Sequence, residues 1–160
     1  MVDELLQGLR RPRFLLVIVA APILAVAASR GPVRARWFGV AGTVIWVTWL
    51  SFEAIADLRL ARFKRDPANH GRGMDRGLWR TSRHPNYFGE TVVWRGILLV
   101  ALATPHGYWA AIGPIAITFL LVRVSGVQML EKGLLDRKPD YADYVRRTSS
   151  FVPRVPRRRP

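Results

Sequence analysis

The chain has 160 residues, half of them hydrophobic, and carries 25 Lys and Arg against 11 Asp and Glu, for a formal net charge of +14. The absence of cysteine excludes disulfides and thiolate metal sites, and the three histidines are too scattered to form an evident metal motif. The basic residues alternate with long apolar runs instead of forming one basic face. This pattern argues against nucleic-acid binding and is typical of an integral membrane protein with segregated basic loops.

Two apolar runs lie in the N-terminal part of the chain. Residues 14–28 predict a first transmembrane helix, although the run contains Pro22 and has 15 residues against the roughly 20 that a spanning helix needs. Because basic residues precede this short run, a signal-peptide core is the alternative. A turn at Arg30-Gly31-Pro32 leads to a second predicted span, Trp37 to Ala56, whose helix is expected to continue through Phe63.

Two further apolar runs follow a polar, Gly-rich loop at residues 64–82, which cannot form a core of its own. The third predicted span extends from about Tyr87 to Ala103 and the fourth from about Tyr108 to Val127. Residues 128–147 predict an amphipathic helix interrupted at Lys138-Pro139. We therefore expect an all-α, polytopic integral membrane protein with about four transmembrane helices and a cytoplasmic C-terminal amphipathic helix.

The distribution of Lys and Arg predicts the orientation in the membrane. Three precede the first run, eight lie between the second and third, and nine follow the fourth, against three between the first and second. Basic residues remain on the cytoplasmic side, so both termini and the long loop are expected there, in the cytoplasmic (inner) membrane. The same residues are also suited to contact with anionic membrane lipids.

The most unusual stretch is Arg-His-Pro-Asn-Tyr-Phe-Gly-Glu at residues 83–90, directly before the third apolar run. Ionisable groups at this depth cost several kcal/mol unless they are paired or serve a ligand. The stretch therefore indicates a cofactor or substrate site at the membrane–water boundary. Structural roles are the alternatives: His84-Pro85 as a helix start, and Glu90 with Arg123 as an ion pair between spans.

The predicted topology brings this stretch to the same membrane face as the polar loop and the C-terminal segment. Together they mix many basic groups with a few carboxylates and an amide. Arginine and lysine suit phosphates, whereas carboxylates, amides and aromatic rings suit ribose and adenine. The mixture favours a nucleotide cofactor, although neither GxGxxG after a strand nor a P-loop is present.

Three segments of the chain carry a family resemblance. They are residues 52–64, residues 77–90, and a third group formed by residues 123–127, 130–132, 141–144 and 151–153. In order and spacing they resemble bacterial membrane proteins related to the C-terminal domain of steroid 5-alpha-reductases. The wider superfamily includes isoprenylcysteine carboxyl methyltransferases, which share an Arg-His-Pro-x-Tyr element. The resemblance implies an N-terminal membrane segment at 1–45, a reductase-like membrane domain at 46–156 and a basic tail at 157–160.

The resemblance implies an NADPH-dependent reductase that transfers a hydride to the carbon–carbon double bond of an enone or steroid-like lipid. The expected cofactor-binding residues are Asp57, Lys64, Arg72, Arg83, His84, Asn86, Glu90, Arg123 and Glu131. Tyr87 is the nearest candidate for a catalytic proton donor. No metal is expected.

Two other functions remain open at the level of sequence. The reductases begin with further spans that carry a substrate-polarising acid and tyrosine, and this chain shows no counterpart of that pair. A non-catalytic or truncated membrane relative is therefore one alternative. An S-adenosylmethionine-dependent membrane methyltransferase, acting on a lipidic small molecule, is the other, because the Arg-His-Pro-x-Tyr element suits it.

Overall fold

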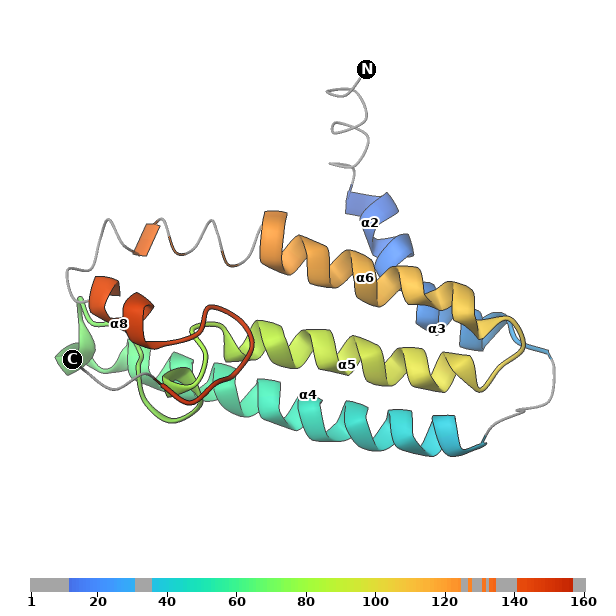
Figure 1. Ribbon diagram of the computed structural model, residues 1–160, viewed down its shortest axis with the longest axis horizontal. Helices are drawn as coiled ribbons and strands as arrows, with labels where there is room; N and C mark the ends of the chain where they lie inside the picture. The colour runs from blue at the N-terminus through green and yellow to red at the C-terminus, as the bar shows by residue number, and fades with distance from the viewer. Residues whose placement is uncertain are drawn as a thin grey trace, which may run out of the picture. The chain divides into compact units, whose positions relative to one another are not determined.

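The computed structural model describes residues 12–30, 36–124, 127, 131, 133–134 and 141–156. These residues form helices and turns and no strand, apart from an isolated bridge between Ser82 and Ser149 (Figure 1). The chain divides into two compact units, one of residues 1–47 and 91–119 and the other of residues 48–90 and 120–160. The helical prediction is confirmed for the described residues.

The first predicted span is not one helix. It is divided into α2 (Pro12–Val19) and α3 (Ala21–Ala28), with a turn at Ala20. The physical reason is Pro22 in the first turn of α3, because its ring nitrogen has no hydrogen to donate to the preceding turn. Within the first unit, α2 and α3 lie against α6 (Ile112–Phe119) (Figure 1).

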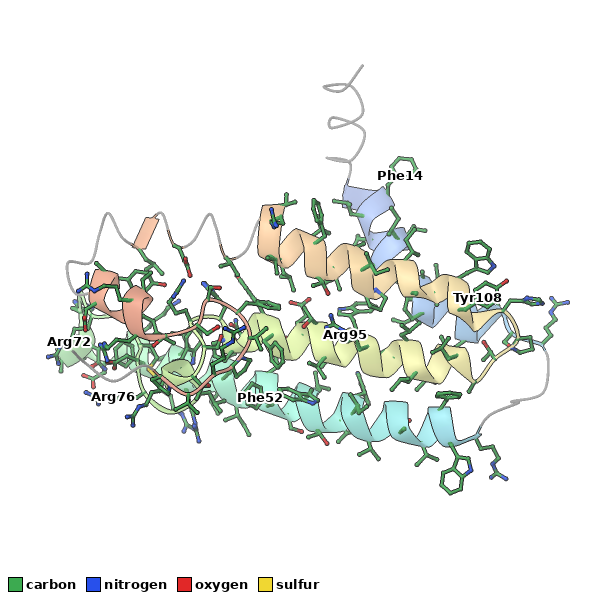
Figure 2. All side chains as sticks on the ribbon, viewed as in Figure 1. Phe14, Phe52, Arg72, Arg76, Arg95 and Tyr108 are labelled. Atoms are coloured by element: carbon green, nitrogen blue, oxygen red, sulfur yellow. The ribbon has the colours of Figure 1, made fainter. Side chains whose placement is uncertain are left out.

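Two helical segments are long and apolar enough to cross a membrane. One is α4 (Arg36–Arg65), which confirms that the second predicted span continues past Ala56 as one helix. The other is the continuous helical stretch Gly107–Val124, formed by η3 (Gly107–Ala111), α6 and the π-helical η4 (Leu120–Val124). In the apolar part of α4 only 6% of the residues are buried, and in that of the Gly107–Val124 stretch 28% are buried. Neither is therefore a core helix of this chain, and Figure 2 shows the side chains that they carry.

The expectation of four spans is therefore not confirmed. The third apolar run forms α5 (Pro85–Leu102), whose 18 residues include Asn86, Glu90 and Arg95 and which is not among the two membrane-length helices. The predicted membrane orientation has no counterpart in these data and stays a prediction.

Helices α4 and α5 approach closely in the first unit because glycine stands on both. A Cβ atom on Gly42 would lie 2.5 Å from the carbonyl oxygen of Gly96, and one on Gly96 would lie 2.9 Å from the backbone nitrogen of Trp46. Small residues that allow backbones to touch are a common basis of helix packing in membranes.

The polar loop has little regular structure, as predicted. It contains two short 3-10 turns, η1 (Pro67–Asn69) and η2 (Gly77–Arg80). Asp66 caps η1 by accepting a hydrogen bond of 2.9 Å from the Ala68 backbone N–H. Of the predicted C-terminal helix, the structure describes α8 (Tyr141–Arg147), whereas residues 135–140 and the tail at 157–160 lie outside the described residues.

Candidate functional site

The segment before α5 is held by the C-terminal part of the second unit. The Arg83 backbone N–H donates to the carbonyl of Ser149 at 2.8 Å, and the Ser82 hydroxyl donates to that of Phe151, also at 2.8 Å. The Arg154 N–H donates to the Thr81 carbonyl at 2.9 Å. Residues separated by about seventy positions are thus joined by hydrogen bonds to backbone carbonyls, which fix the start of α5.

The side chain of Arg83 is buried, with 7% of its surface exposed. Its Nε donates to Glu131 Oε1 at 2.7 Å, and its Nη1 donates to the carbonyls of Val145, at 2.9 Å, and Thr148. A buried guanidinium is tolerated when its charge is paired and its donors are used, and both conditions hold. Arg83 therefore joins the C-terminal residues to the start of α5.

His84 belongs to the same network. Its Nε2 lies 3.3 Å from the same oxygen of Glu131, and its ring stacks on Tyr87 with centroids 5.5 Å apart and planes 8° from parallel. Burial acts to raise the pKa of the Glu131 carboxyl, but hydrogen bonds from His84 and Arg83, and their charges, outweigh it and hold the pKa below its ordinary value. The structure brings Arg83, His84 and Glu131 together, and their polar groups contact one another; their predicted role in cofactor binding stays a prediction.

A cavity of about 330 Å³ lies beside this network, and we call it the aromatic pocket. Its lining residues are Leu60, Lys64, Gly73, Met74, Trp79, Arg83, His84, Asn86, Tyr87, Leu134, Tyr141 and Tyr144. Two of them carry a buried polar atom with no hydrogen-bond partner in the described part of the chain, namely Trp79 Nε1 and Asn86 Oδ1. Leaving such groups unpaired costs about 1–3 kcal/mol each.

Three carboxylates gather on α4 and α5 in the same unit. Glu90 and Asp57 are close enough to Glu53 and to Tyr87 to interact with both electrostatically. The approach is possible because Gly89 has no side chain: a Cβ atom there would lie 3.2 Å from Cβ of Glu53. Asp57 and Glu90 thus lie near Tyr87, although neither lines the aromatic pocket.

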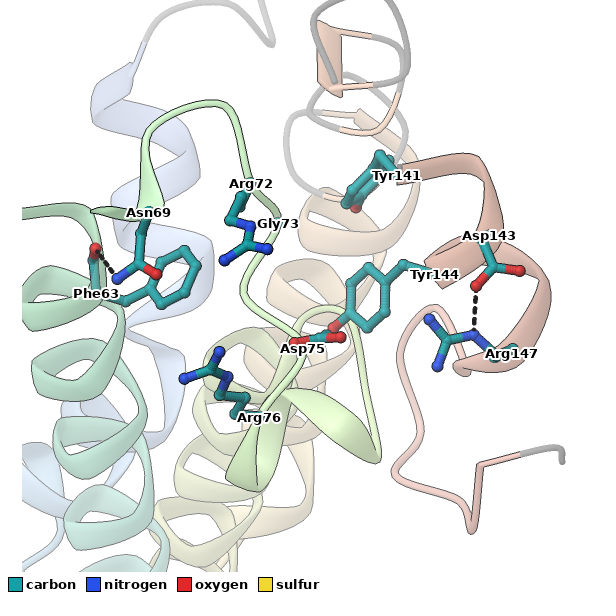
Figure 3. A pocket seen from close by; sticks show the side chains of 10 residues that line it. All are labelled: Phe63, Asn69, Arg72, Gly73, Asp75, Arg76, Tyr141, Asp143, Tyr144 and Arg147. Carbon is teal, nitrogen blue, oxygen red and sulfur yellow. Dashed lines mark hydrogen bonds and ion pairs between the residues drawn. The ribbon is translucent and has the colours of Figure 1, made fainter. Parts of the chain in front are cut away.

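Arg72 lies in a different cavity, of about 610 Å³, which we call the basic cavity (Figure 3). Arg123 is exposed in the π-helical turn η4 and lines neither cavity. The predicted set is therefore divided: Lys64, Arg83, His84, Asn86 and Tyr87 line the aromatic pocket.

Sequence reasoning missed three aromatic residues of the site. Trp79 is 6% exposed, and Tyr141 and Tyr144 are 4% and 5% exposed, so all three form walls and not surface anchors. The Tyr144 hydroxyl donates to the backbone carbonyl of Trp79. Burial raises the pKa of Tyr141 to about 12 and also raises that of Tyr144. The spacing of the two tyrosines, three apart, was the available signal.

The fold and the site together define a helical protein with two membrane-length apolar helices and a cavity lined by polar and aromatic side chains. Residues 10–148 match the family described as "Protein of unknown function (DUF1295)", and the chain belongs to that family. No solved structure matches the chain significantly.

One curated relative matches part of the chain. The chain is 32% identical over 87 residues to the "Probable O-methyltransferase ustE" of Ustilaginoidea virens. The match covers 54% of this chain and 30% of that protein, so the chain spans about a third of the relative's length. These comparisons give no support to the predicted NADPH reductase and favour the methyltransferase alternative.

Proposed function

We propose that this protein is an S-adenosylmethionine-dependent methyltransferase of the membrane, acting on an acceptor that partitions into lipid. The observation that carries the proposal is the aromatic pocket with its two unpartnered polar atoms, Trp79 Nε1 and Asn86 Oδ1. The partial similarity to a probable O-methyltransferase supports the reaction class. The two apolar helices support the location.

The lining of the aromatic pocket fits the chemical groups of this cofactor. Four aromatic side chains, of Trp79, Tyr87, Tyr141 and Tyr144, suit a cationic sulfonium and an adenine ring. Lys64 suits the carboxylate of the methionine part, and the unpartnered donor and acceptor suit its polar edges. The volume of about 330 Å³ falls at the lower end of the range of about 300–1,000 Å³ found for small-molecule sites.

The cofactor, when bound, supplies an electrophilic methyl group on a positively charged sulfur. The contribution of the chain is to hold that group and the acceptor oxygen in line and to exclude water. A hydroxyl acceptor must also lose its proton, and Glu90 and Asp57 are the carboxylates near Tyr87 that we assign to accept it. The ring of Tyr87, beside these two carboxylates, is held in place by its stacking on His84.

The proposal is tested by titrating the purified protein in detergent with S-adenosylmethionine and, separately, with NADPH, following thermal unfolding. A ligand at one hundred times its Kd stabilises the folded state by about 2.7 kcal/mol. We expect stabilisation by S-adenosylmethionine. Stabilisation by NADPH alone would instead support the reductase, and stabilisation by neither would support a non-catalytic relative.

A matched pair of tryptophan variants locates the site. Trp79→Phe keeps an aromatic ring and removes the buried, unpartnered N–H, so binding of S-adenosylmethionine is expected to weaken about tenfold, a typical loss for one hydrogen bond. Trp109→Phe makes the same change at a residue that is 73% exposed and lies outside the pocket, and it should leave binding unchanged. Equal binding by both variants would place the cofactor elsewhere.

A further inference from the structure

The basic cavity is larger than the aromatic pocket and has a different character. Its lining residues are Phe63, Asn69, Arg72, Gly73, Asp75, Arg76, Tyr141, Asp143, Tyr144 and Arg147. Arg72 and Arg76 come from the polar loop, and Arg147 comes from α8 on the other side of Tyr144 (Figure 3). Three guanidinium groups therefore approach one space from two separate segments.

The lining also holds two carboxylates, Asp75 and Asp143. Asp143 accepts hydrogen bonds from Arg147 Nε at 2.8 Å and from Arg146 Nη2 at 3.2 Å, and Arg146 does not line the cavity. One carboxylate is thus shared with an arginine from outside. Asp75, the other carboxylate of the lining, lies beside the ring of Tyr144 (Figure 3).

A buried neutral donor completes the cavity. Tyr141 is 4% exposed and lines the cavity. Gly73 gives the loop room to pack on this ring, because a Cβ atom there would lie 3.3 Å from the ring carbon Cδ2. A tyrosine hydroxyl is protonated at neutral pH and can donate, and burial raises the pKa of Tyr141 further, to about 12.

Three guanidiniums from two directions suit a tetrahedral oxyanion. Arginine forks match the oxygens of phosphate, and charge-assisted hydrogen bonds of this kind are about twice as strong as neutral ones. A planar carboxylate has only two oxygens and would leave part of this donor set unused. We propose that the basic cavity is a phosphate-binding site, filled either by the headgroup of a phosphate-bearing lipid or by a soluble phosphate compound.

The two cavities are neighbours, because Gly73, Tyr141 and Tyr144 line both. The inference does not depend on the proposed methyl transfer, since its three arginines do not line the aromatic pocket and its probes are different.

The experiment measures binding of two probes to the full chain in a non-ionic detergent at constant ionic strength. The probes are inorganic phosphate and dihexanoyl phosphatidic acid, with dihexanoyl phosphatidylcholine, whose phosphate is masked by a cation, as the comparison. Saturable binding of phosphatidic acid alone identifies a lipid headgroup, and similar binding of both probes identifies a free phosphate. If neither phosphate nor phosphatidic acid binds more tightly than phosphatidylcholine, the proposal is wrong.

Charge variants separate a built site from general attraction to a basic protein. Arg76→Gln is expected to weaken the better-bound probe about tenfold, whereas Arg62→Gln, an equal charge change outside the lining, should change binding less than twofold. Asp75→Asn should tighten binding severalfold, a gain that loss of folding cannot produce. Equal losses in Arg76→Gln and Arg62→Gln, or no gain in Asp75→Asn, would overturn the proposal.

Discussion

Replacing Arg83 by glutamine should lower the free energy of unfolding, because Arg83 joins the C-terminal residues to the start of α5. The change removes the contact to Glu131 at 2.7 Å and leaves the carbonyls of Val145 and Thr148 without this donor. Removing one partner of a fully buried ion pair costs about 3–5 kcal/mol, and the lower end applies here because Glu131 is half-buried. His84, 3.3 Å from the same carboxylate oxygen, offsets part of this cost, so we expect about 3 kcal/mol.

The effect is measured by thermal unfolding in detergent, followed by the fluorescence of the chain's tryptophans. For a domain of this size, 1 kcal/mol corresponds to roughly 2–4 °C in Tm, so Arg83→Gln should lower Tm by about 10 °C. Arg80→Gln is the matched control, since Arg80 lies three residues away and is exposed. If the two variants unfold within about 2 °C of each other, the role assigned to Arg83 is incorrect.

Three further predictions concern pH, helix packing and sidedness. Because the pKa of Glu131 is lower in the folded chain than its unfolded value of about 4.5, its ionised form stabilises the fold. That stability is present above pH 4.5 and is lost as the pH falls through the folded pKa. Glu131→Gln should therefore flatten the fall in Tm over this acidic range. Gly96→Leu should strongly reduce Tm, because its Cβ atom would meet α4 backbone at 2.9 Å, whereas Gly39→Leu, with nothing within 4 Å, should not; similar Tm values would contradict the close helix contact. Since the chain has no cysteine, an introduced single cysteine reports which side of the membrane its position faces. Arg154→Cys should react with an impermeant thiol reagent only from the cytoplasmic side, and Arg30→Cys only from the opposite side. The reverse pattern would contradict the predicted orientation.

The helices were largely predictable because each follows from local patterns. The apolar run after Trp37 predicted one helix that continues to Phe63, and the structure extends it to Arg65. The prediction of one helix over residues 14–28 was wrong for a local reason as well. Pro22 lacks a backbone N–H and has a fixed φ, and this divides the helix although the residues on both sides are apolar. Four apolar runs did not give four membrane-length helices, because Asn86, Glu90 and Arg95 reduce the hydropathy of α5.

The site was predictable only in part. The cost of polar groups beside an apolar run identified Arg83 to Glu90 as unusual, and Asn86 and Tyr87 do line a cavity. The choice of cofactor followed the many arginines and the reductase resemblance. The structure divides those arginines: Arg83 is paired with Glu131, and Arg72 lies in the separate basic cavity. A count of charges cannot distinguish a cation that binds a ligand from one that holds the fold.

The sequence by itself determined the helical character, the polar loop and the stretch around which the site is built, because hydropathy, proline and glycine act over a few neighbouring residues. Only the tertiary structure decided which residues face each other. The contact of Arg83 with Glu131, and the wall formed by Trp79 and Tyr144, join positions about fifty and sixty-five residues apart. Such pairs form through the packing of the loop on the C-terminal segment, and no local pattern encodes which partners that packing selects.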